Sequence, residues 1–323
     1  MDYMDFKINE VKNGDVIVAD FLIKTAEIKP TKKQDKFFID LILFNSNTEI
    51  QAKKWDGSEE ILKTFKDAYA IRVKATVNEW QGELQLIIEQ YKVINESDIS
   101  IDNFLPKSTI SFDIMDQEFK NTIENISNPI IKDITNFIYK EKRDALKTHG
   151  GAKTQHHNYV SGLMQHEYDM LMTAKAMVNN IQTYSDLNTD YLYAGIILHD
   201  LGKIDELKAN KYGIIEDYTM VGELVGHLVI GSENIVEAAC KLGLDKNSKE
   251  LILLRHMMIS HHGELEYGSN RNPMTREADL LYRLDNMNCH DTMIKNVIDT
   301  LNNNTFSNRQ WALDNRKIFR GDN

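Results

Sequence analysis

The second half of the chain contains the stretch Ile196-Ile197-Leu198-His199-Asp200-Leu201-Gly202-Lys203, in which an apolar helical run ends at an adjacent histidine and aspartate. An unpaired charge is costly to bury, so a buried imidazole and carboxylate both need partners. Metal ions can serve both. Because neighbouring helix positions point about 100° apart, His199 and Asp200 can approach a metal site from different directions. The two carboxylate oxygens of Asp200 can bridge two ions.

Further residues of the metal-ligand type lie outside this stretch. They are His166, His227, the adjacent pair His261-His262 and Asp285, each in a segment whose apolar periodicity is helical. Imidazole and carboxylate together suit Mn²⁺, Fe²⁺ or Zn²⁺, whereas ligation by oxygen alone suits Mg²⁺ or Ca²⁺. Seven ligands are too many for one ion with an open position. They predict a two-metal site, and sites of this kind are common in enzymes that hydrolyse phosphate esters.

Length and composition favour a soluble protein of two domains. The chain has 323 residues, of which 42% are hydrophobic and 27% charged, and this length exceeds that of one typical domain. No apolar run reaches the roughly 18 residues of a transmembrane helix, and the acidic N-terminus lacks the apolar core of a secretory signal. We expect no membrane association and a cytoplasmic location, with Cys240 and Cys289 as reduced thiols in the core.

The net charge of −11 argues against binding of nucleic acid by bulk electrostatics, because proteins that hold a polyanion in this way are basic. Residues 1–95 carry 14 Lys or Arg and 16 Asp or Glu, a balance of −2, so the remaining −9 falls on the later part. Any contact with nucleic acid must therefore depend on local patches.

The residue pattern changes near residue 96. Before it, β-branched and aromatic residues alternate with polar ones in short runs, which is typical of strands. The predicted strands are 15–28, 36–45, 48–55, 69–79 and 83–92, with a helix at 58–66. Five strands with a helix between the third and fourth predict an OB-type barrel, a fold that often binds single strands.

Aromatic and basic residues of this barrel are candidates for binding substrate. Phe37 and Phe38 begin the second strand, Trp55 ends the third, and Lys53 lies close by; Trp80, Tyr91, Lys32, Lys33, Lys36 and Lys54 are further members of this set. Aromatic faces stack bases and lysines follow phosphates in such grooves. The alternative is that about half of the aromatics fill the barrel, and alternation requires one of Phe37 and Phe38 to point inward.

After residue 112 the periodicity is helical almost throughout. Asn128-Pro129 is typical of a helix cap followed by proline at the first helical position. Thr189, Thr219 and Ser248 are predicted caps of later helices. One interruption, at about 204–217, predicts a short hairpin between two helices.

The order His166, His199-Asp200, Asp285 resembles that of the HD-domain metal-dependent phosphohydrolases, and the added histidines His227 and His261-His262 resemble their binuclear branch. An OB-type domain precedes this region, and the same chain contains the motifs Gly162-Leu163-Met164-Gln165-His166, Gly226-His227 and Ser260-His261-His262-Gly263-Glu264-Leu265-Glu266-Tyr267-Gly268-Ser269. In this combination the chain resembles, over almost its full length, the YhaM family of 3'-5' exoribonucleases. The resemblance implies an α+β protein in which a five-stranded OB-type barrel precedes an all-α HD domain. The expected boundaries are 1–95 for the OB-fold domain, 96–118 for a linker, 119–301 for the HD domain and 302–323 for a C-terminal tail.

The resemblance also implies roles for individual residues. The first ion would be held by His166, His199, Asp200 and Asp285, and the second by Asp200, His227, His261 and His262, with Asp200 as the bridge. The ions are expected to be Mn²⁺, with Co²⁺, Fe²⁺ or Zn²⁺ as alternatives. Lys203 would reach a phosphate oxygen, or else would only complement the helix dipole. His157 and Arg271 are candidates for touching the substrate.

The implied partner is single-stranded RNA and, to some extent, single-stranded DNA, and we expect a homo-oligomer. Two other functions stay open. The chain could be a phosphohydrolase of nucleotides or dinucleotides in which the barrel serves assembly. It could also be a nucleic-acid-binding protein whose HD domain is structural. The glycine after His261-His262 differs from the His-His-Glu of HD-GYP-type cyclic-dinucleotide phosphodiesterases, so that substrate class loses support.

Overall fold

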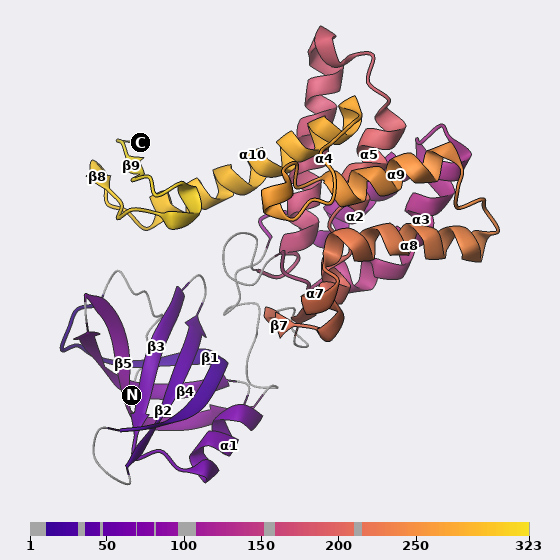
Figure 1. The fold of residues 1–323 in the computed structure, drawn as a ribbon. Coiled ribbons are helices and arrows are strands. Elements are labelled where there is room, and N and C mark those ends of the chain that lie inside the picture. Colours follow the sequence, from indigo (N-terminus) through magenta and orange to yellow (C-terminus); the bar gives the residue numbers. More distant parts are fainter. Residues whose placement is uncertain are drawn as a thin grey trace. The chain divides into compact units, whose positions relative to one another are not determined.

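The chain forms two compact units, Met1–Pro106 (unit 1) and Lys107–Asn323 (unit 2). The computed structural model describes residues 11–31, 36–45, 48–68, 70–80, 82–95, 108–151, 159–209 and 215–322. Unit 1 is built of strands and unit 2 mainly of helices (Figure 1), which confirms the predicted α+β class. None of the helices in the described ranges combines the length and the apolar character that crossing a bilayer requires.

Unit 1 is a closed barrel of five strands in the order β1-β2-β3-β5-β4. The elements are β1 (Val16–Pro30), β2 (Phe37–Asn45), β3 (Thr48–Trp55), α1 (Glu59–Asp67), β4 (Ala70–Trp80) and β5 (Glu83–Ile94). Strands β3 and β5 pair in parallel and so close the barrel, whereas the other neighbouring pairs are antiparallel. The predicted OB topology is therefore confirmed, including the helix between the third and fourth strands.

Alternation along the strands decides which side chains fill the barrel. On β2 the inward residues Ile39, Leu41 and Leu43 are fully buried, as a period of two requires for a half-buried strand. Phe65 of α1 is fully buried as well, and its ring centroid lies 4.6 Å from that of Tyr91. Tyr91 therefore packs against α1 and is partly buried, which favours for this residue the alternative that some of the aromatics belong to the core.

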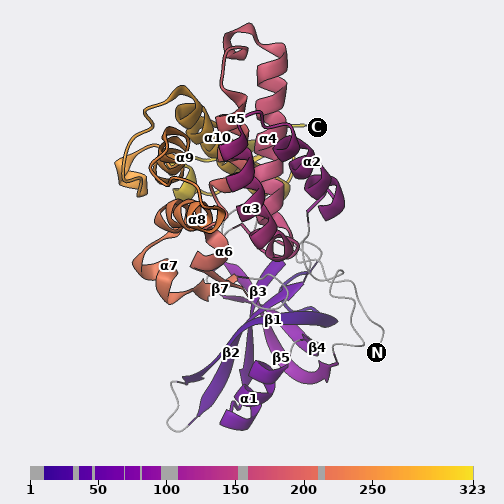
Figure 2. The same cartoon turned by 90° about the vertical axis from the view of Figure 1, so that its right-hand side faces the viewer.

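Unit 2 is a bundle of helices (Figure 2) and also contains two short hairpins. The helices are α2 (Phe112–Glu124), α3 (Pro129–Leu146), α4 (Gly162–Asn180), α5 (Thr189–Leu198), α6 (Lys203–Glu206), α7 (Met220–Leu224), α8 (His227–Leu242), α9 (Lys249–Ser260) and α10 (Arg276–Asp299). Strands β6 (Leu207–Ala209) and β7 (Ile215–Tyr218) form the predicted interruption, and β8 (Thr305–Phe306) pairs with β9 (Phe319–Arg320). The tip of the first hairpin lies outside the described residues.

Most of the predicted helix caps are confirmed. The Asn128 side chain accepts hydrogen bonds from the backbone amides of Ile130 and Ile131, and Pro129 is the first helical residue. Thr219 and Ser248 cap α7 and α9. The prediction for Thr189 is wrong by one position, because the side chain of Asn188 makes the capping bonds of α5.

Helix α2 is held to α3 by a buried carboxylate. Asp116 accepts hydrogen bonds from Arg143 Nε (2.6 Å) and Nη2 (2.8 Å) and from the Tyr139 hydroxyl (2.7 Å). The hydrogen bond from the Arg143 guanidinium holds the pKa of Asp116 well below its usual range, although burial opposes this shift. The carboxylate is therefore ionised and fully paired, which is how a buried charge is tolerated.

Three sequence predictions differ from the structure. The interval 96–118, expected as a linker, includes the start of α2, because Phe112, Met115 and Phe119 turn one face toward the core of unit 2. The expected C-terminal tail, 302–323, contains the hairpin of β8 and β9. Cys240 is exposed and Cys289 is only partly buried, so the prediction that both are core residues is wrong.

Candidate metal centre

The carboxylate of Asp200 is the centre of a buried cluster of imidazoles. Its Oδ2 lies 3.6 Å from His166 Nε2 and 3.5 Å from His199 Nε2. Its Oδ1 lies 3.5 Å from His227 Nε2 and 3.6 Å from His261 Nε2. Each oxygen thus faces its own pair of histidines, and the carboxylate divides the cluster into two halves.

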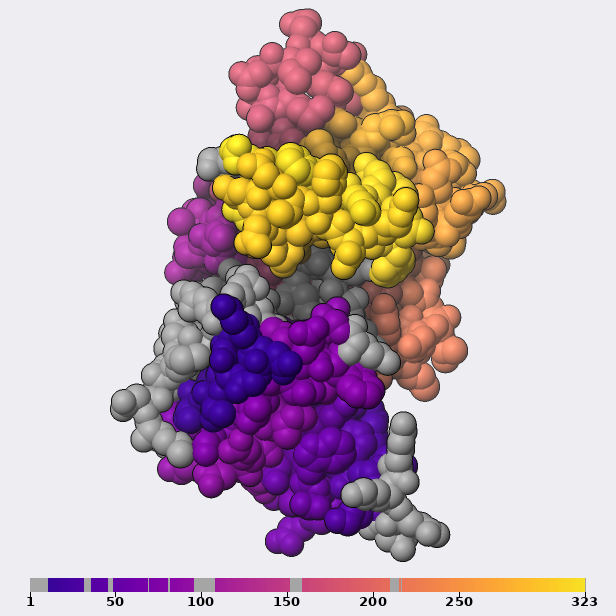
Figure 3. Space-filling model, turned by 90° about the vertical axis from the view of Figure 1, so that its left-hand side faces the viewer, coloured from indigo at the N-terminus to yellow at the C-terminus, as the bar shows by residue number. Residues whose placement is uncertain are grey.

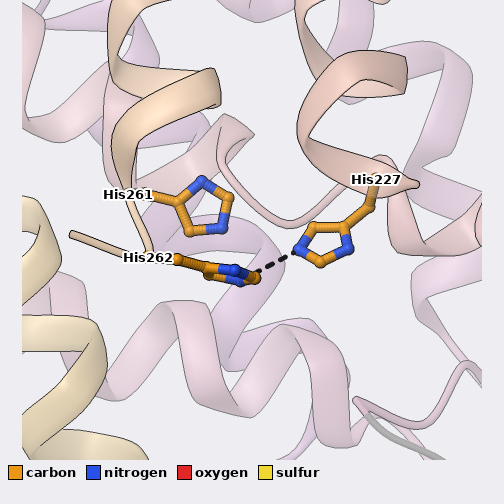
Figure 4. Close-up of side chains that lie close together, drawn as sticks. All are labelled: His227, His261 and His262. Atoms are coloured by element: carbon orange, nitrogen blue, oxygen red, sulfur yellow. Dashed lines mark hydrogen bonds between the residues drawn. The ribbon is translucent and has the colours of Figure 1, made fainter. Parts of the chain in front are cut away.

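Each of the two remaining predicted ligands adjoins a different one of these halves. Asp285 Oδ1 lies 3.2 Å from His166 Nε2. On the other side, His262 Nε2 lies 3.2 Å from His227 Nε2, and Figure 4 shows these rings turned toward each other beside His261. The structure therefore brings together all seven side chains that the sequence singled out, from α4, α8, α10 and the residues that directly follow α5 and α9.

Every histidine of the cluster is oriented by an oxygen acceptor on its outer nitrogen. The acceptors of the Nδ1 atoms are the carbonyl oxygens of Ile196 for His199 (2.9 Å), Met258 for His261 (2.8 Å) and Tyr267 for His262 (2.9 Å), the amide oxygen of Asn288 for His166 (2.8 Å) and the carboxylate of Glu206 for His227 (2.9 Å). Because these oxygens accept, Nδ1 carries the proton and the lone pair is on Nε2. This is the tautomer of a metal ligand whose orientation is fixed by an outer partner.

The protonation states of Asp200 and His199 also suit metal binding. Burial would raise the pKa of Asp200, but the charge of Lys203 and the surrounding histidines hold that pKa well below its usual range. Burial lowers the pKa of His199 to about 3, although Asp200 opposes this shift. Near pH 7 the carboxylate is therefore charged and the His199 imidazole neutral, which are the forms that bind cations.

The cluster contains buried polar atoms that the protein alone does not satisfy. Among the described residues, the Nε2 atoms of His199 and His261 and Oδ1 of Asp200 are buried without a hydrogen-bond partner. Buried polar atoms of this kind call for an explanation such as a bound ion. Three sets of ligand atoms lie within 4.8 Å of one another: His166, His199 and Asp200; His227, His261 and His262; and His166, Asp285 and Cys289. The residues therefore fit divalent metal ions held by nitrogen and oxygen ligands.

Lys203 has a contact that the sequence analysis did not anticipate. Its Nζ lies 2.6 Å from Oδ2 of Asp200, and its side chain is largely buried. Burial lowers the pKa of Lys203, but the charge of Asp200 outweighs this and raises it, so the ammonium is charged. In the structure, Lys203 thus pairs with the central carboxylate, and a contact with a phosphate stays a prediction.

Gly202 allows the central carboxylate to lie beside α8. A Cβ atom at this position would lie 2.6 Å from the carbonyl oxygen of His227. A larger residue would push apart the chain that carries Asp200 and the first turn of α8, which carries His227. The glycine after the His-Asp pair is therefore needed for close packing of two ligand-bearing segments.

Four residues of the centre were missed by the sequence analysis. Asn288 and Cys289 follow Asp285 by three and four positions, about one helical turn, and therefore lie on the same face of α10 as Asp285. This spacing could have identified them in the sequence as neighbours of the metal ligand. Glu206 is twenty-one positions before His227, and no local pattern connects the two. Glu167 is fully buried beside His166, and burial raises the pKa of its carboxyl well above the usual range.

The predicted substrate-binding residues of unit 1 gather at one end of β2 and β3. Phe38 pairs with Trp55 across the two strands, with ring centroids 5.2 Å apart, and Lys53 Nζ lies 5.8 Å from the Phe38 centroid. Trp55 is 44% exposed and Phe37 is 45% exposed. Phe37 therefore does not fill the barrel, contrary to the expectation that one ring of the Phe37-Phe38 pair points inward.

The same sheet is not uniformly basic. A groove of about 500 Å³ over β1, β2 and β3 is lined by Glu27, Asp40 and Glu49 as well as Lys29. Lys29 Nζ lies 2.6 Å from Asp40 Oδ2. The aromatic end of the sheet is thus better suited to bases, and its middle is mixed in charge.

Arg271 is exposed in the connection between α9 and α10. His157, Lys32 and Lys33 lie outside the described residues. Within the described ranges, Arg271 makes no hydrogen bond or ion pair with the seven clustered side chains.

Comparison with known proteins agrees with this architecture. Residues 163–288 match the model of the HD domain family, and this range contains all seven clustered ligands. An HD domain indicates a metal-dependent phosphohydrolase. Among solved structures, the chain is similar to the second OB-fold domain of replication protein A from Methanococcus maripaludis, with 17% identity over 29% of this chain and 97% of that chain and a TM-score of 0.24.

Two further solved structures are similar over smaller shares of their length. One is RecG bound to a three-way DNA junction, with 15% identity over 60% of this chain and 35% of that chain and a TM-score of 0.24. The other is a replication protein A heterotrimer bound to single-stranded DNA, with 12% identity over 35% and 29% and a TM-score of 0.21. Because these values are low, the OB assignment depends on the strand order of the barrel itself.

Proposed function

We propose that the chain is a metal-dependent 3'-5' exoribonuclease that hydrolyses single-stranded RNA and, to a lesser extent, single-stranded DNA. The observation that carries the hydrolytic part is the arrangement of histidines in two pairs on the two oxygens of Asp200. The polarity of attack and the preference for RNA are supported by the resemblance to the YhaM family. In this proposal the barrel, predicted as residues 1–95, binds the strand, and the helical region 119–301 hydrolyses it.

The ligand sets follow the two halves of the cluster. His166, His199, Asp200 and Asp285 would hold one ion, and Asp200, His227, His261 and His262 the other, with Mn²⁺ as the expected metal. Two such ions, when bound, lower the pKa of a shared water and neutralise charge on the phosphate oxygens. The protein contributes by fixing the ligands: Glu206 and Asn288 orient His227 and His166.

The barrel face supports binding of an unpaired strand. The tilted rings of Phe38 and Trp55, with Lys53 above one of them, offer stacking surfaces and one cation. Stacking of this kind tolerates any base, because every base has a flat face. A rigid A-form duplex keeps its bases stacked inside and cannot use such rings.

Hairpin RNAs with 3' or 5' single-stranded overhangs test the proposal. With Mn²⁺ and a 5' label, a 3' overhang should be shortened in a ladder that stops near the base of the stem, and a 5' overhang should persist. The Asp200→Asn variant is the matched control for contaminating nuclease. Equal degradation of blunt duplex and 3' overhang, or shortening from the 5' end, would exclude the proposed substrate and direction.

The acidic residues of the barrel groove favour a second candidate. Glu27, Asp40 and Glu49 would repel a phosphate backbone that crossed the middle of the sheet. In that case the barrel would serve assembly of a homo-oligomer, and the metal centre would hydrolyse nucleotides or dinucleotides. Cleavage of a small chromogenic phosphodiester by a protein that leaves every RNA intact would support this second function.

A further inference from the structure

The chain ends in a folded element that neither the metal centre nor the barrel face uses. Residues 305–320, here the C-terminal hairpin, turn back on themselves: Phe306 pairs with Phe319 in the strands, and Gln310 bridges to Arg316 near the turn. The hairpin is fixed to the end of α10, because Arg320 Nη1 donates hydrogen bonds to the carbonyl oxygen of Leu301 (2.8 Å) and to that of Ile298 (3.1 Å). Figure 3 shows this part of the chain, in yellow, as a raised and accessible surface.

Large aromatic rings cover the hairpin without being buried. Trp311 is 78% exposed, Phe306 64% and Phe319 46%, whereas Leu313 beside them is almost fully buried. The Phe306 and Phe319 rings lie 4.7 Å apart between centroids and form one surface. Aromatic surface gathered in this way marks an interaction site, because scattered exposed side chains are normal but clusters are not.

The charge of the hairpin is opposite to that of the whole chain. From residue 302 to 322 there are four cations and two anions, whereas the chain has a net charge of −11; the cations are Arg309, Arg316, Lys317 and Arg320, and the anions are Asp314 and Asp322. Arg309 and Lys317 are exposed. Exposed aromatic rings with flanking cations are the pattern of surfaces that bind single-stranded nucleic acid.

A groove lies where the hairpin meets α10. Its volume is about 370 Å³, and its lining includes the polar side chains of Asn296 and Thr300 from the helix and of Asn308 and Gln310 from the hairpin. Amide side chains offer donors and acceptors that match the edges of nucleobases. The groove thus adds polar contacts beside the aromatic surface.

We propose that the C-terminal hairpin is a second binding site for single-stranded nucleic acid, in which a base stacks on Trp311 and Arg309 and Lys317 contact phosphates. The identity of this ligand rests on the proposed function. Binding at the C-terminal hairpin does not require hydrolysis of the strand. The site can therefore be tested by measuring binding alone, under conditions in which the protein does not cleave RNA.

The position of the hairpin on α10 determines which strands it can help to hold. Asp285 and Thr300 are separated by fifteen positions of this helix and its cap, which corresponds to about 22 Å at 1.5 Å per residue. A stacked strand advances about 3.4 Å per nucleotide, so roughly six or seven nucleotides span this distance. The hairpin should therefore increase affinity for long strands and have no effect on fragments of about three nucleotides.

Fluorescence of Trp311 provides the direct test. The chain has three tryptophans, so the full-length Trp55→Phe/Trp80→Phe variant reports on Trp311 alone. In the presence of a chelator, a uridine oligomer of about 20 nucleotides should quench this emission in a saturable way. Adding Arg309→Ala/Lys317→Ala to this background should weaken the quenching. The charge-matched control Lys246→Ala/Lys249→Ala, at exposed positions before α9 and at its first residue, should leave it unchanged.

Removal of the Trp311 ring measures how much this side chain contributes to strand affinity. Because Trp311 is largely exposed, Trp311→Ala removes little packing, and it should weaken binding of the long strand by about 5- to 150-fold, as expected for one stacked base. Binding of the strand is measured independently by the fluorescence anisotropy of a labelled oligonucleotide. If Trp311 emission does not change at concentrations that saturate this binding, or if the strand does not bind at all, the inference is overturned. A Trp311→Ala variant that changes only the sedimentation of the protein would instead assign the hairpin to contact between copies. Quenching without any shortening of RNA in Mn²⁺ would refute the proposed function and leave this site standing.

Discussion

The metal centre and the barrel face differ in how far the surrounding structure constrains their side chains. Asp200 is 1% exposed and faces four imidazoles and a lysine, and the outer nitrogen of each histidine is held by an oxygen. Trp55 is 44% exposed and packs on Phe38 from a neighbouring strand. Buried polar groups need specific partners, so few residue combinations are possible at the centre. An exposed aromatic pair is compatible with several binding partners. It therefore indicates a binding surface but does not identify a chemical reaction.

The largest effect is expected at the central carboxylate. Asp200→Asn keeps the side-chain shape but removes the charge that both halves of the cluster share. Hydrolysis should fall by more than about 100-fold, beyond the 10- to 100-fold that loss of an outer partner typically costs. Elemental analysis should find both ions depleted.

Two variants control this result. Asp245→Asn changes an exposed carboxylate of the same unit and should leave activity and metal content unchanged. His227→Ala should remove chiefly one of the two ions. Retention of two full equivalents of metal in Asp200→Asn would contradict the bridging role.

Stability of unit 2 should depend on Asp116 independently of metal. Asp116→Asn leaves Arg143 without its anion and should reduce the free energy of unfolding by about 3 kcal/mol, the lower end for a buried pair, since 28% of the Arg143 side chain is exposed. The folded pKa of Asp116 lies below its ordinary value of 3.8. Its contribution is therefore present above about pH 4 and lost as the pH falls below that value.

Unfolding by urea, followed by helical circular dichroism at several pH values in a chelator, measures this contribution. In a Trp311→Phe background, emission of Trp55 and Trp80, both in the barrel, serves as an internal reference for unit 1. If the variant loses stability in acid as steeply as the unmodified chain, another group is responsible for the loss.

A smaller effect is expected for the residue that orients His227. Glu206→Gln keeps one oxygen acceptor but removes the charge that faces Nδ1 of His227, 2.9 Å away. The concentration of Mn²⁺ needed for half-maximal activity should rise about 10- to 100-fold, and excess metal should restore the rate. Glu223→Gln, on α7, is the control. A loss of rate that excess metal does not repair would contradict a purely orienting role.

The barrel face should affect affinity and leave the chemical step unchanged. Trp55→Ala should weaken binding of long single-stranded RNA by about 1–3 kcal/mol, the value of one stacked base. Cleavage of a short chromogenic phosphodiester should be unaffected. Met220→Ala, which removes an even more exposed apolar side chain in unit 2, is the control. Unchanged affinity for long strands would remove Trp55 from the binding surface.

The smallest effect concerns salt. Each phosphate contact contributes about 0.7 to the slope of log affinity against log salt for single strands. Lys53→Ala should therefore lower this slope by about 0.7 if its ammonium contacts one phosphate, and Lys63→Ala, on the exposed side of α1, should not change it. Equal slopes for Lys53→Ala and the unmodified chain would show that Lys53 makes no phosphate contact.

The sequence by itself determined the two kinds of architecture and the seven clustered side chains. Strand alternation such as Ile39, Leu41 and Leu43 is a local pattern with a period of two, and it predicts the barrel because burial follows it. The cap at Asn128-Pro129 is local as well. The His199-Asp200 pair was recognisable because two polar residues at the end of an apolar helix need partners.

Only the tertiary structure decided how these residues meet. Which oxygen of Asp200 faces which histidines depends on the packing of α4, α5, α8 and α9, and no spacing along the chain encodes it. The contacts of Glu206 with His227 and of Lys203 with Asp200 have the same origin. Tyr91 turned out to pack on Phe65 because α1 covers that end of the barrel. Local patterns specify elements and ligand types, whereas contacts between distant segments depend on shapes that only the folded chain creates.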